Sequence, residues 1–462
     1  MIPKRPINAD VPAEEPKAEK PEPKAPEKTE PAPAPKTRNS AGGRPLSGMS
    51  REKTKAAHGS GPGTPRLLLA LVALALVFIV VAVVWGTSGD NGSSETPAPT
   101  PAPAAGEKPD EVAAEQTAEA LGYPGFATNN TTRIGGSDPA ANAAGAALAV
   151  FPSTTPEQRP AAVTIVSEED WAGAIAAAVL MAAPVRAPIL FSGPDEMPGV
   201  SEEALAALDP QGSEDTGQAT LFAIGTVSYP GKAAPVDSGD PAATAAQIAT
   251  LRDRLFGEPP EHIVVASDSR PDFAVPAAAW AARSGDPVLF TGAKKLPAPT
   301  AAMLKAHPKV PVYVLGPSSV VSSAVVREIS KLAKKVKRVA GEDPVANALA
   351  LARYRDGSFG WNVNDPGHGF VLARDDSQLD AAAAAPLSAS GTWGPLLLTD
   401  SATTLPAELR EYFLDVKPGY TTNPTRAFYN HVWVIGDQEA IDVQQQAEVD
   451  ELAELAKIGG GE

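Results

Sequence analysis

The 462-residue chain contains no cysteine and only five histidines. The absence of cysteine excludes disulfide bonds, thiolate zinc sites and a cysteine nucleophile. No two histidines stand in an HxxxH or HExxH pattern, so the sequence predicts neither a metal site nor a cofactor. Aromatic residues make up only 5% of the chain and the formal net charge is −16, a combination that argues against nucleic acid as a partner.

Charge is distributed unevenly along the chain. Residues 1–66 carry 13 Lys and Arg against 8 Asp and Glu, whereas the remaining residues carry 26 against 47. Directly after the basic segment comes an uncharged run, LLLALVALALVFIVVAVVW, whose length as a helix is about 28 Å, close to the thickness of a bilayer core. The run is followed by no A-x-A cleavage site, so we expect residues 67–86 to form an uncleaved transmembrane helix.

The basic flank predicts the orientation of this helix. Seven Lys and Arg and one acid, Glu52, lie between residues 36 and 66, and positive charge stays on the cytoplasmic side. We therefore expect a single-pass protein of the cell membrane with a cytoplasmic N-terminus and an extracytoplasmic body. The composition of residues 1–66 predicts a disordered arm, which is either a docking segment for a cytoplasmic partner or a solvated tail. Residues 87–120 are expected to form a linker with a short helix.

The stretch RIGGSDPAANAAGAALA, at residues 133–149, has two further copies that begin at Pro235 and Arg338. The copies align on aspartates 102 and 103 residues apart, a period that predicts three domain-sized modules rather than a solenoid. In each copy an Asp-Pro pair precedes an apolar helical run, as expected of an N-cap followed by proline at the first helical position. The expected helix starts are Asp138, Pro139, Asp240, Pro241, Asp343 and Pro344.

Each module continues with three apolar runs separated by Ala-rich and Pro-rich stretches. In chain order the runs are AAVTIVS, PILFSG and ATLFAIG, then HIVVAS, PVLFTG and PVYVLG, then GFVLAR, PLLLTD and HVWVIG. Continuous apolar strands that alternate with helices predict a parallel sheet covered on both faces, so each module is expected to be a small doubly wound α/β unit. The expected module boundaries are 121–232, 233–336 and 337–458.

At these residues the chain resembles the cell wall binding repeat 2 family of Gram-positive bacteria. The opening of that family's repeat, Arg-hydrophobic-x-Gly-x-Asp, matches the first copy at Arg133, Ile134, Gly136 and Asp138 and the third at Arg338, Val339, Gly341 and Asp343. The middle copy has Pro235 and Ser238 in the Arg and Gly positions. The resemblance implies three tandem Rossmann-like lobes around a pseudo-threefold axis, noncovalent binding to anionic wall polymers, and no catalysis.

The loops that follow the first strand of each module are candidate binding sites, because α/β sheets bind ligands at the carboxyl ends of their strands. The acidic body disfavours a polyanion as ligand through its overall charge. The segment KLAKKVKR is the best candidate for a local basic patch, and the alternative interpretation is a solvated helix face. The candidate ligand-binding residues are Ser167, Glu168, Ser267, Asp268, Arg374 and Asp375, with Lys334 and Lys335 from the basic segment.

The sequence leaves three classes of function open. No nucleophile elbow, P-loop or histidine base accompanies the acids in the sequence, so we expect no enzyme. The leading interpretation is a noncatalytic envelope protein that binds a wall polymer or glycan. The alternatives are an enzyme acting on envelope carbohydrate through paired carboxylates, and a protein-interaction scaffold of the cell envelope.

Overall fold

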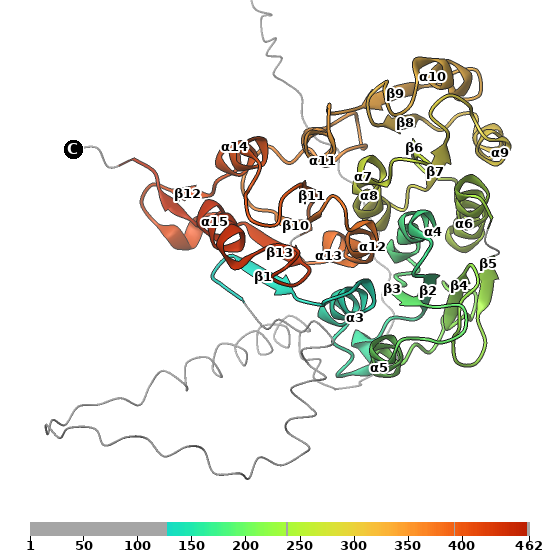
Figure 1. Ribbon diagram of the computed structural model, residues 1–462, viewed down its shortest axis with the longest axis horizontal. Coiled ribbons are helices and arrows are strands. Elements are labelled where there is room, and N and C mark those ends of the chain that lie inside the picture. Colours follow the sequence, from blue (N-terminus) through green and yellow to red (C-terminus); the bar gives the residue numbers. More distant parts are fainter. Residues whose placement is uncertain (1–126, 237–238, 392, 460–462) are drawn as a thin grey trace, which may run out of the picture. The chain divides into compact units, whose positions relative to one another are not determined.

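The computed structural model describes residues 127–236, 239–391 and 393–459, which belong to one compact unit of the chain (Figure 1). Three four-stranded sheets are present there, and every strand pair within them is parallel. Each of the nine predicted apolar runs contains one strand. The predicted α/β class with parallel sheets in several lobes is therefore confirmed.

The three sheets share one strand order. In the first, the order is β3 (Ile189–Ser192), β2 (Val163–Ser167), β4 (Leu221–Ile224) and β5 (Ala234–Val236). In the second, it is β7 (Val288–Thr291), β6 (Ile263–Ser267), β8 (Val312–Leu315) and β9 (Val336–Val339). In the third, it is β11 (Leu396–Thr399), β10 (Gly369–Arg374), β13 (His431–Ile435) and β1 (Thr131–Ile134). We call each sheet with its helices the first, second and third lobe.

The fourth strand of each sheet comes from the repeated opening motif. The predicted boundaries assign β1, β5 and β9 to the module that follows each of them, whereas their hydrogen bonds complete the sheet of the lobe before. β1 is the first strand of the described chain, yet it joins the third sheet, where its Arg133 is in register with Val434 of β13. Figure 1 shows β1, coloured as the start of the described chain, beside β13 near its end. The beginning and the end of the described chain thus share one sheet.

The helices that follow the motif begin as the sequence predicts. They are α3 (Pro139–Val150), α6 (Pro241–Phe256) and α11 (Pro344–Arg353), each with proline in its first turn. The carboxylates of Asp138, Asp240 and Asp343 accept hydrogen bonds of 2.8–2.9 Å from backbone N–H groups three residues ahead. Each helix then packs against the outer strand of the next sheet, β3, β7 or β11 respectively. The motif therefore leads the chain from one lobe to the next.

Ala-rich helices join the lobes at the centre. Each follows the first strand of its lobe: α4 (Trp171–Ala177) with η2 (Ala178–Met181), α7 (Pro271–Ala274) with α8 (Pro276–Ser284), and α12 (Gln378–Ala383) with α13 (Ala385–Ala389). η2, α8 and α13 pack against one another, and α4, α7 and α12 pack against α6, α11 and α3 of the neighbouring lobes. Alanine side chains allow this close approach, and the buried core is continuous from Ile134 to Ala453.

The remaining elements lie mostly on the outer faces of the lobes. α5 packs against α3, α9 against α6, and α14 and α15 against each other. A small sheet of β12 and β14 extends from the third lobe. The bounds are η1 (Pro156–Gln158), α5 (Gly199–Leu208), α9 (Ala298–Ala306), α10 (Ser323–Ile329), α14 (Ala407–Asp415), β12 (Gly419–Tyr420), η3 (Pro424–Arg426), α15 (Val443–Ala453) and β14 (Ala456–Lys457).

The predicted localisation requires correction. No helix of residues 127–236, 239–391 and 393–459 is long and apolar enough to cross a membrane. The transmembrane helix expected at residues 67–86 lies outside the described residues, as do the arm expected at 1–66 and the linker expected at 87–120. The single-pass membrane localisation is therefore withdrawn, together with the membrane and cytoplasmic partners that it implied.

Candidate functional site

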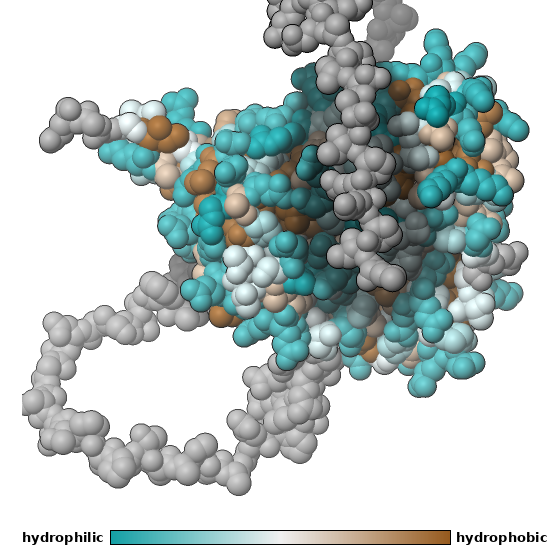
Figure 2. Space-filling view, turned by 45° about the horizontal axis from the view of Figure 1, so that its top comes forward, coloured by the Kyte–Doolittle hydropathy of each residue, from teal (hydrophilic) through white to brown (hydrophobic). Residues whose placement is uncertain are grey.

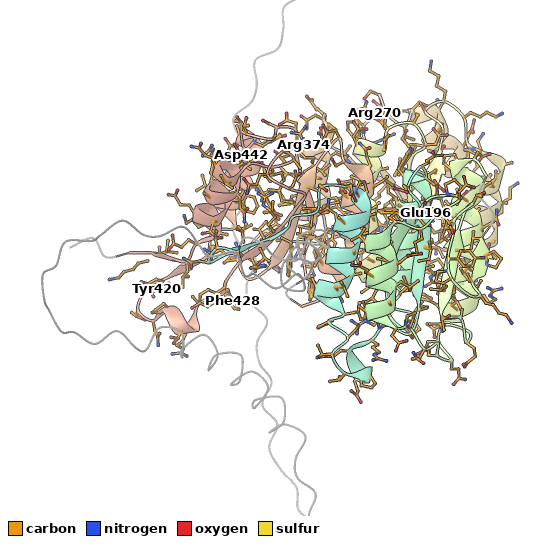
Figure 3. All side chains as sticks on the ribbon, turned by 60° about the horizontal axis from the view of Figure 1, so that its bottom comes forward. Glu196, Arg270, Arg374, Tyr420, Phe428 and Asp442 are labelled. Atoms are coloured by element: carbon orange, nitrogen blue, oxygen red, sulfur yellow. The ribbon has the colours of Figure 1, made fainter. Side chains whose placement is uncertain are left out.

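The three sheets end on one side of this unit. Figure 3 shows Arg270, Arg374 and Asp442 along that side, where the loops after the strands lie. In each sheet the chain connections reverse direction between the first and third strands of the lobe, for example between β2 and β4. Such a reversal opens a crevice between the two loops that leave these strands, the usual ligand position in doubly wound sheets.

The first lobe has a cavity of about 320 Å³ at this reversal point. The loops after β2, β3 and β4 line it, and the approach to α6 contributes Gly239. The lining residues are Ser167, Glu169, Asp170, Pro194, Gly225, Thr226 and Gly239. We call this cavity the first-lobe crevice. Among these described lining residues there is no Lys or Arg, so carboxylates, hydroxyls and backbone groups dominate its chemistry.

The sequence identified part of this crevice. The candidate Ser167 lines it, whereas the Glu168 carboxylate lies beside Gly193 on the neighbouring strand end. Glu169 and Asp170, which follow in the same acidic run, line the crevice instead. The chain turns directly after β2, so consecutive side chains point in different directions and spacing alone does not separate them.

Asp170 combines a structural role with a place in the crevice wall. Its carboxylate caps α4 by accepting a 2.7 Å hydrogen bond from the Gly173 N–H. Burial raises the pKa of this carboxyl group, and hydrogen bonds from the Gly173 and Ala172 N–H groups counteract the rise. The cap ties the loop after β2 to the first turn of α4.

Strand register makes the candidate residues of the three lobes equivalent. Ser167 pairs with Ser192, Ser267 with Thr291, and Arg374 with Thr399, at the same position of each sheet. The next residue in each lobe is an acid: Glu168, Asp268 and Asp375. The sequence candidates therefore form three matched pairs at the carboxyl ends of the strands.

The third lobe departs from the other two. Asp400 stands where the first and second lobes have Gly193 and Gly292. Burial raises the pKa of Asp375, and the carboxylates of Asp376 and Asp400 add to the rise. Arg374 lowers the pKa of Asp375 but does not cancel the rise. Its guanidinium pairs instead with Asp376, with Nη2 2.8 Å from Oδ2.

A larger cavity of about 630 Å³ lies beside the end of β11 in the third lobe. Its lining joins the helix start Asp343 to the loop before α14, so a capping residue also faces a cavity. Burial raises the pKa of Glu408 here, and the carboxylate of Asp343 adds to the rise. The lining residues are Asp343, Asp400, Ser401, Thr404, Leu405, Pro406, Ala407, Glu408 and Arg410.

The basic candidates lie elsewhere. The Lys335 carbonyl accepts a hydrogen bond from the N–H of Val312, the first residue of β8, which places the segment at the amino-terminal edge of the second sheet. Lys335 and Lys337 form ion pairs with Asp356, and both lysines hold the pKa of that carboxyl group well below its usual range. Lys334 is exposed on the same segment. The structure therefore does not bring Lys334 and Lys335 together with Ser267 and Asp268.

Among the described residues, no group of three or more histidine or acidic side chains is arranged to hold a metal ion.

The second and third lobes match a known protein family. Two stretches match cell wall binding domain 2. The matched residues are 237–326 and 338–445, which lie in the second and third lobes. The match agrees with the family that the repeated motif predicted. The first expected module lies outside it, so a third repeat of this family stays a prediction. No curated protein matches the chain in sequence.

Two solved structures are similar in fold, both from Clostridium difficile. Cwp6 has a TM-score of 0.56 at 20% identity, covering 70% of this chain and 48% of its own. Cwp8 has a TM-score of 0.54 at 21% identity, covering 74% of this chain and 54% of its own. The chain thus spans about half the length of these proteins, and the likeness concerns the fold.

One acid at a lobe boundary gives a pH-dependent prediction. Asp380 of α12 accepts a 3.1 Å hydrogen bond from the Asn142 side chain of α3. Burial raises its pKa to about 6, with Asp138 and Asp437 adding to the rise and the hydrogen bond from Asn142 opposing it. Because the pKa is higher folded than unfolded, ionisation is disfavoured in the folded state. The unfolding free energy should therefore fall as pH rises from about 4 to 7.

Asp380→Asn removes this charge and keeps an acceptor for Asn142. We expect it to raise the unfolding free energy at pH 7 by about 1 to 2 kcal/mol and to leave it unchanged below about pH 4. Urea denaturation across this pH range measures the difference. Asp376→Asn is the control, because the ion pair with Arg374 lowers the pKa of Asp376 and its loss should not stabilise. A gain for Asp380→Asn that does not vary with pH would contradict the prediction.

Proposed function

We propose that this protein binds the cell wall noncovalently through the carboxyl-terminal edge of its lobes. The observation that carries the proposal is the first-lobe crevice, a preformed cavity at the reversal point of a doubly wound sheet. The match of the second and third lobes to a cell wall binding family supports it. The fold shared with Cwp6 and Cwp8 is consistent with the same assignment.

The chemistry of the crevice selects the ligand class. Glu169 and Asp170 offer carboxylate acceptors, and Ser167 and Thr226 offer hydroxyls. Acceptors of this kind match the hydroxyl groups of a saccharide and repel an anionic polymer. Residues beyond the basic segment carry 26 basic against 47 acidic side chains, and the surface in Figure 2 is mainly hydrophilic with scattered apolar residues. We infer that the first lobe takes an uncharged, hydroxyl-rich stretch of wall glycan.

The arrangement of the lobes suggests a shared binding surface. We propose that the three Rossmann-like lobes are related by a pseudo-threefold axis that passes between η2, α8 and α13. Their strand-end loops would then form one face toward the wall, with the protein on the outside of the cell. The packing of α4, α7 and α12 on neighbouring lobes supports a fixed spacing between the three loops.

Sedimentation of the full chain with isolated walls tests the proposal. Thr226→Trp should fill the first-lobe crevice and weaken wall binding about tenfold or more. Thr154→Trp places the same side chain in the α3–β2 connection, at the opposite edge of the same lobe, and should bind as the parent does. Binding that stays constant between about 0.05 and 0.5 M salt supports an uncharged ligand.

Two outcomes would overturn parts of this proposal. A full chain that stays in the supernatant would overturn wall binding itself. Binding that falls steeply with salt would instead retain wall binding and identify a charged polymer as the ligand.

A further inference from the structure

A serine, a histidine and an aspartate meet at the amino-terminal edge of the second lobe. Ser358 Oγ lies 3.4 Å from His262 Nε2, and His262 Nδ1 lies 3.1 Å from Asp286 Oδ2. His262 directly precedes β6, Asp286 lies two residues before β7, and Ser358 comes from the turn after α11 of the third lobe. The cluster is therefore assembled from two lobes, at the edge opposite the crevices proposed to bind the wall.

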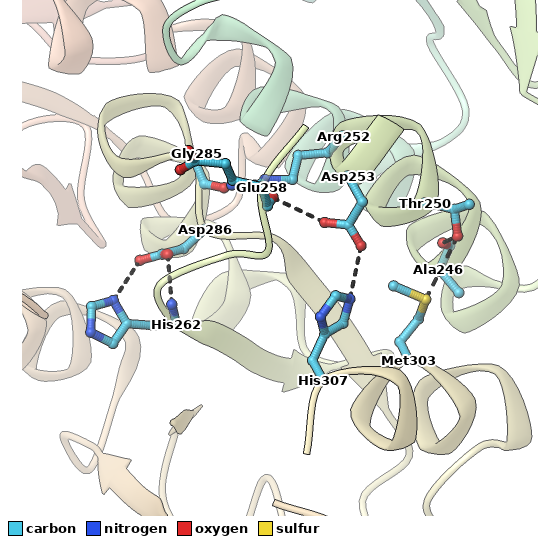
Figure 4. A network of polar contacts seen from close by, with 10 residues as sticks. All are labelled: Ala246, Thr250, Arg252, Asp253, Glu258, His262, Gly285, Asp286, Met303 and His307. Atoms are coloured by element: carbon cyan, nitrogen blue, oxygen red, sulfur yellow. Dashed lines mark hydrogen bonds and ion pairs between the residues drawn. The ribbon is translucent and has the colours of Figure 1, made fainter. Parts of the chain in front are cut away.

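Asp286 fixes the histidine in one tautomer. Its side chain is 2% exposed, and Figure 4 shows it contacting His262 twice. Oδ1 accepts a 2.9 Å hydrogen bond from the His262 backbone N–H, and Oδ2 accepts one of 2.9 Å from Trp280 Nε1. A carboxylate facing Nδ1 places the ring proton on Nδ1 and leaves the Nε2 lone pair free to face Ser358.

Aromatic packing holds the imidazole in place. His262 is 6% exposed and lies edge-on to the rings of Tyr313 and Phe359. Tyr313 and Phe359 stack at 3.6 Å, and Trp280 packs edge-on against Phe359. The imidazole is thus held in one orientation with Nε2 toward Ser358, and a positioned base near its proton donor is what general-base catalysis requires.

The serine, in contrast, is exposed on a tight turn. Asp356 and Phe359 close this turn through two backbone hydrogen bonds, and Ser358 lies between them. The flanking Gly357 and Gly360 have φ values of +69° and +98°, a backbone region that favours glycine. Ser358 is therefore accessible to solvent, with its hydroxyl beside Nε2 of the imidazole.

We propose that Ser358, His262 and Asp286 form a hydrolytic site for carboxylic esters, with Ser358 as nucleophile and His262 as general base. A nucleophile within reach of a base that a third group orients is the signature of covalent acyl transfer, and such distances are often long before substrate binds. This activity is separate from the proposed wall binding and uses none of its residues.

The reaction balances with water as the only co-substrate. Ser358 Oγ attacks the ester carbonyl while its proton passes to His262 Nε2, and Asp286 stabilises the imidazolium. The tetrahedral intermediate collapses, and the leaving alkoxide takes the proton from Nε2, which leaves an acylated Ser358. Water then attacks the acyl carbonyl with His262 again as base, which releases the carboxylic acid and restores the serine.

The surroundings of Ser358 favour one class of ester. Lys335 and Lys337 both pair with Asp356, two positions from Ser358, so two cations surround one carboxylate. An ester whose remaining groups are anionic is attracted to this surface. Because Ser358 is exposed, a short acyl group carried on a long chain can reach it. The site therefore fits small acyl esters on an anionic carrier.

Labelling of the full chain with a fluorophosphonate tests the proposal directly. Ser358 Oγ should displace fluoride and become phosphonylated, as located by mass spectrometry of the digested protein. Ser358→Ala should remove this label and reduce hydrolysis of p-nitrophenyl acetate at least about 100-fold. Ser318 is an exposed serine after β8, at the carboxyl-terminal edge of the second lobe. Ser318→Ala should keep both the label and the hydrolysis.

A second variant separates catalysis from a structural role of the histidine. His262→Ala should lose labelling, and added imidazole should restore part of it, which a purely structural role does not predict. Near-ultraviolet circular dichroism verifies that this variant is folded, and Ser358→Ala should sediment with walls as the parent does. Absence of the label from Ser358 in the folded parent, or parental ester hydrolysis by Ser358→Ala, would overturn the proposal.

Discussion

Gly341→Ala should lower the unfolding free energy by about 3 kcal/mol or more. A Cβ atom on Gly341 would lie 2.2 Å from the carbonyl carbon of Ala346 and from the backbone nitrogen of Asn347. These atoms belong to the first turn of α11 and have no rotamer by which to move away. The helix would have to shift as a whole from β11 and α14, against which it packs. Overpacking against backbone therefore costs more than overpacking against a side chain.

The glycine control is Gly199→Ala. No atom lies within 4 Å of a Cβ built on Gly199, at the start of α5, so this change should alter the unfolding free energy by no more than about 0.5 kcal/mol. Urea unfolding followed by circular dichroism compares the two variants. Gly136→Ala should resemble Gly341→Ala, because its Cβ would lie 2.6 Å from the Asn142 nitrogen. Equal midpoints for Gly341→Ala and Gly199→Ala would refute the close-approach explanation.

Arg133→Ala should cost about 3 to 4 kcal/mol, because a buried set of acceptors loses its donors. Arg133 is 3% exposed, and its guanidinium donates to the carbonyls of Gly436, Asp437 and Ile441 at 2.6–2.8 Å. Its Nε also donates to Gln446 Oε1 at 2.9 Å. These partners come from the far end of the chain, so the arginine fastens β1 into the third sheet.

Arg338→Ala is the matched control for this prediction. Arg338 occupies the same motif position on β9 but donates to two carbonyls, those of Gly316 and Val321, and is only partly buried. Its loss should cost about half as much. Thermal and urea unfolding of both variants give the comparison. A larger loss for Arg338→Ala than for Arg133→Ala would show that burial and donor number do not decide the cost.

The three fixed residues of the opening motif thus have structural roles in the first and third copies. The arginine donates to carbonyls of the loop that follows the neighbouring strand of the sheet, the glycine allows the next helix to approach, and the aspartate caps that helix. The middle copy has Pro235 and Ser238 at the first two positions, and residues 237–238 lie outside the described residues. Asp240 retains its capping hydrogen bond there. The motif recurs because the chain must pass between lobes in the same way each time.

The sequence by itself determined the α/β class, the apolar strands, the parallel pairing and the helix starts at Asp138, Asp240 and Asp343. The helix starts and the apolar strands depend on patterns within short segments. The parallel pairing followed from the alternation of strands with helices, although the paired strands themselves are distant in the chain, as for Val163 and Leu221. It also placed Ser167 at a strand end, where a crevice is expected. It could not separate Glu168 from Glu169, because a turn decides their directions.

Only the tertiary structure decided which sheet each motif strand joins and which distant side chains meet. Arg133 and Gln446 are 313 residues apart, and Ser358 and His262 are 96 apart. No local pattern encodes such pairs, since they form only when Ala-rich helices of three lobes pack together and return the chain to its start. Lys335 directly precedes β9, and the parallel pairing of β9 with β8 places it at the amino-terminal edge, away from the acidic loops at the carboxyl ends of the strands.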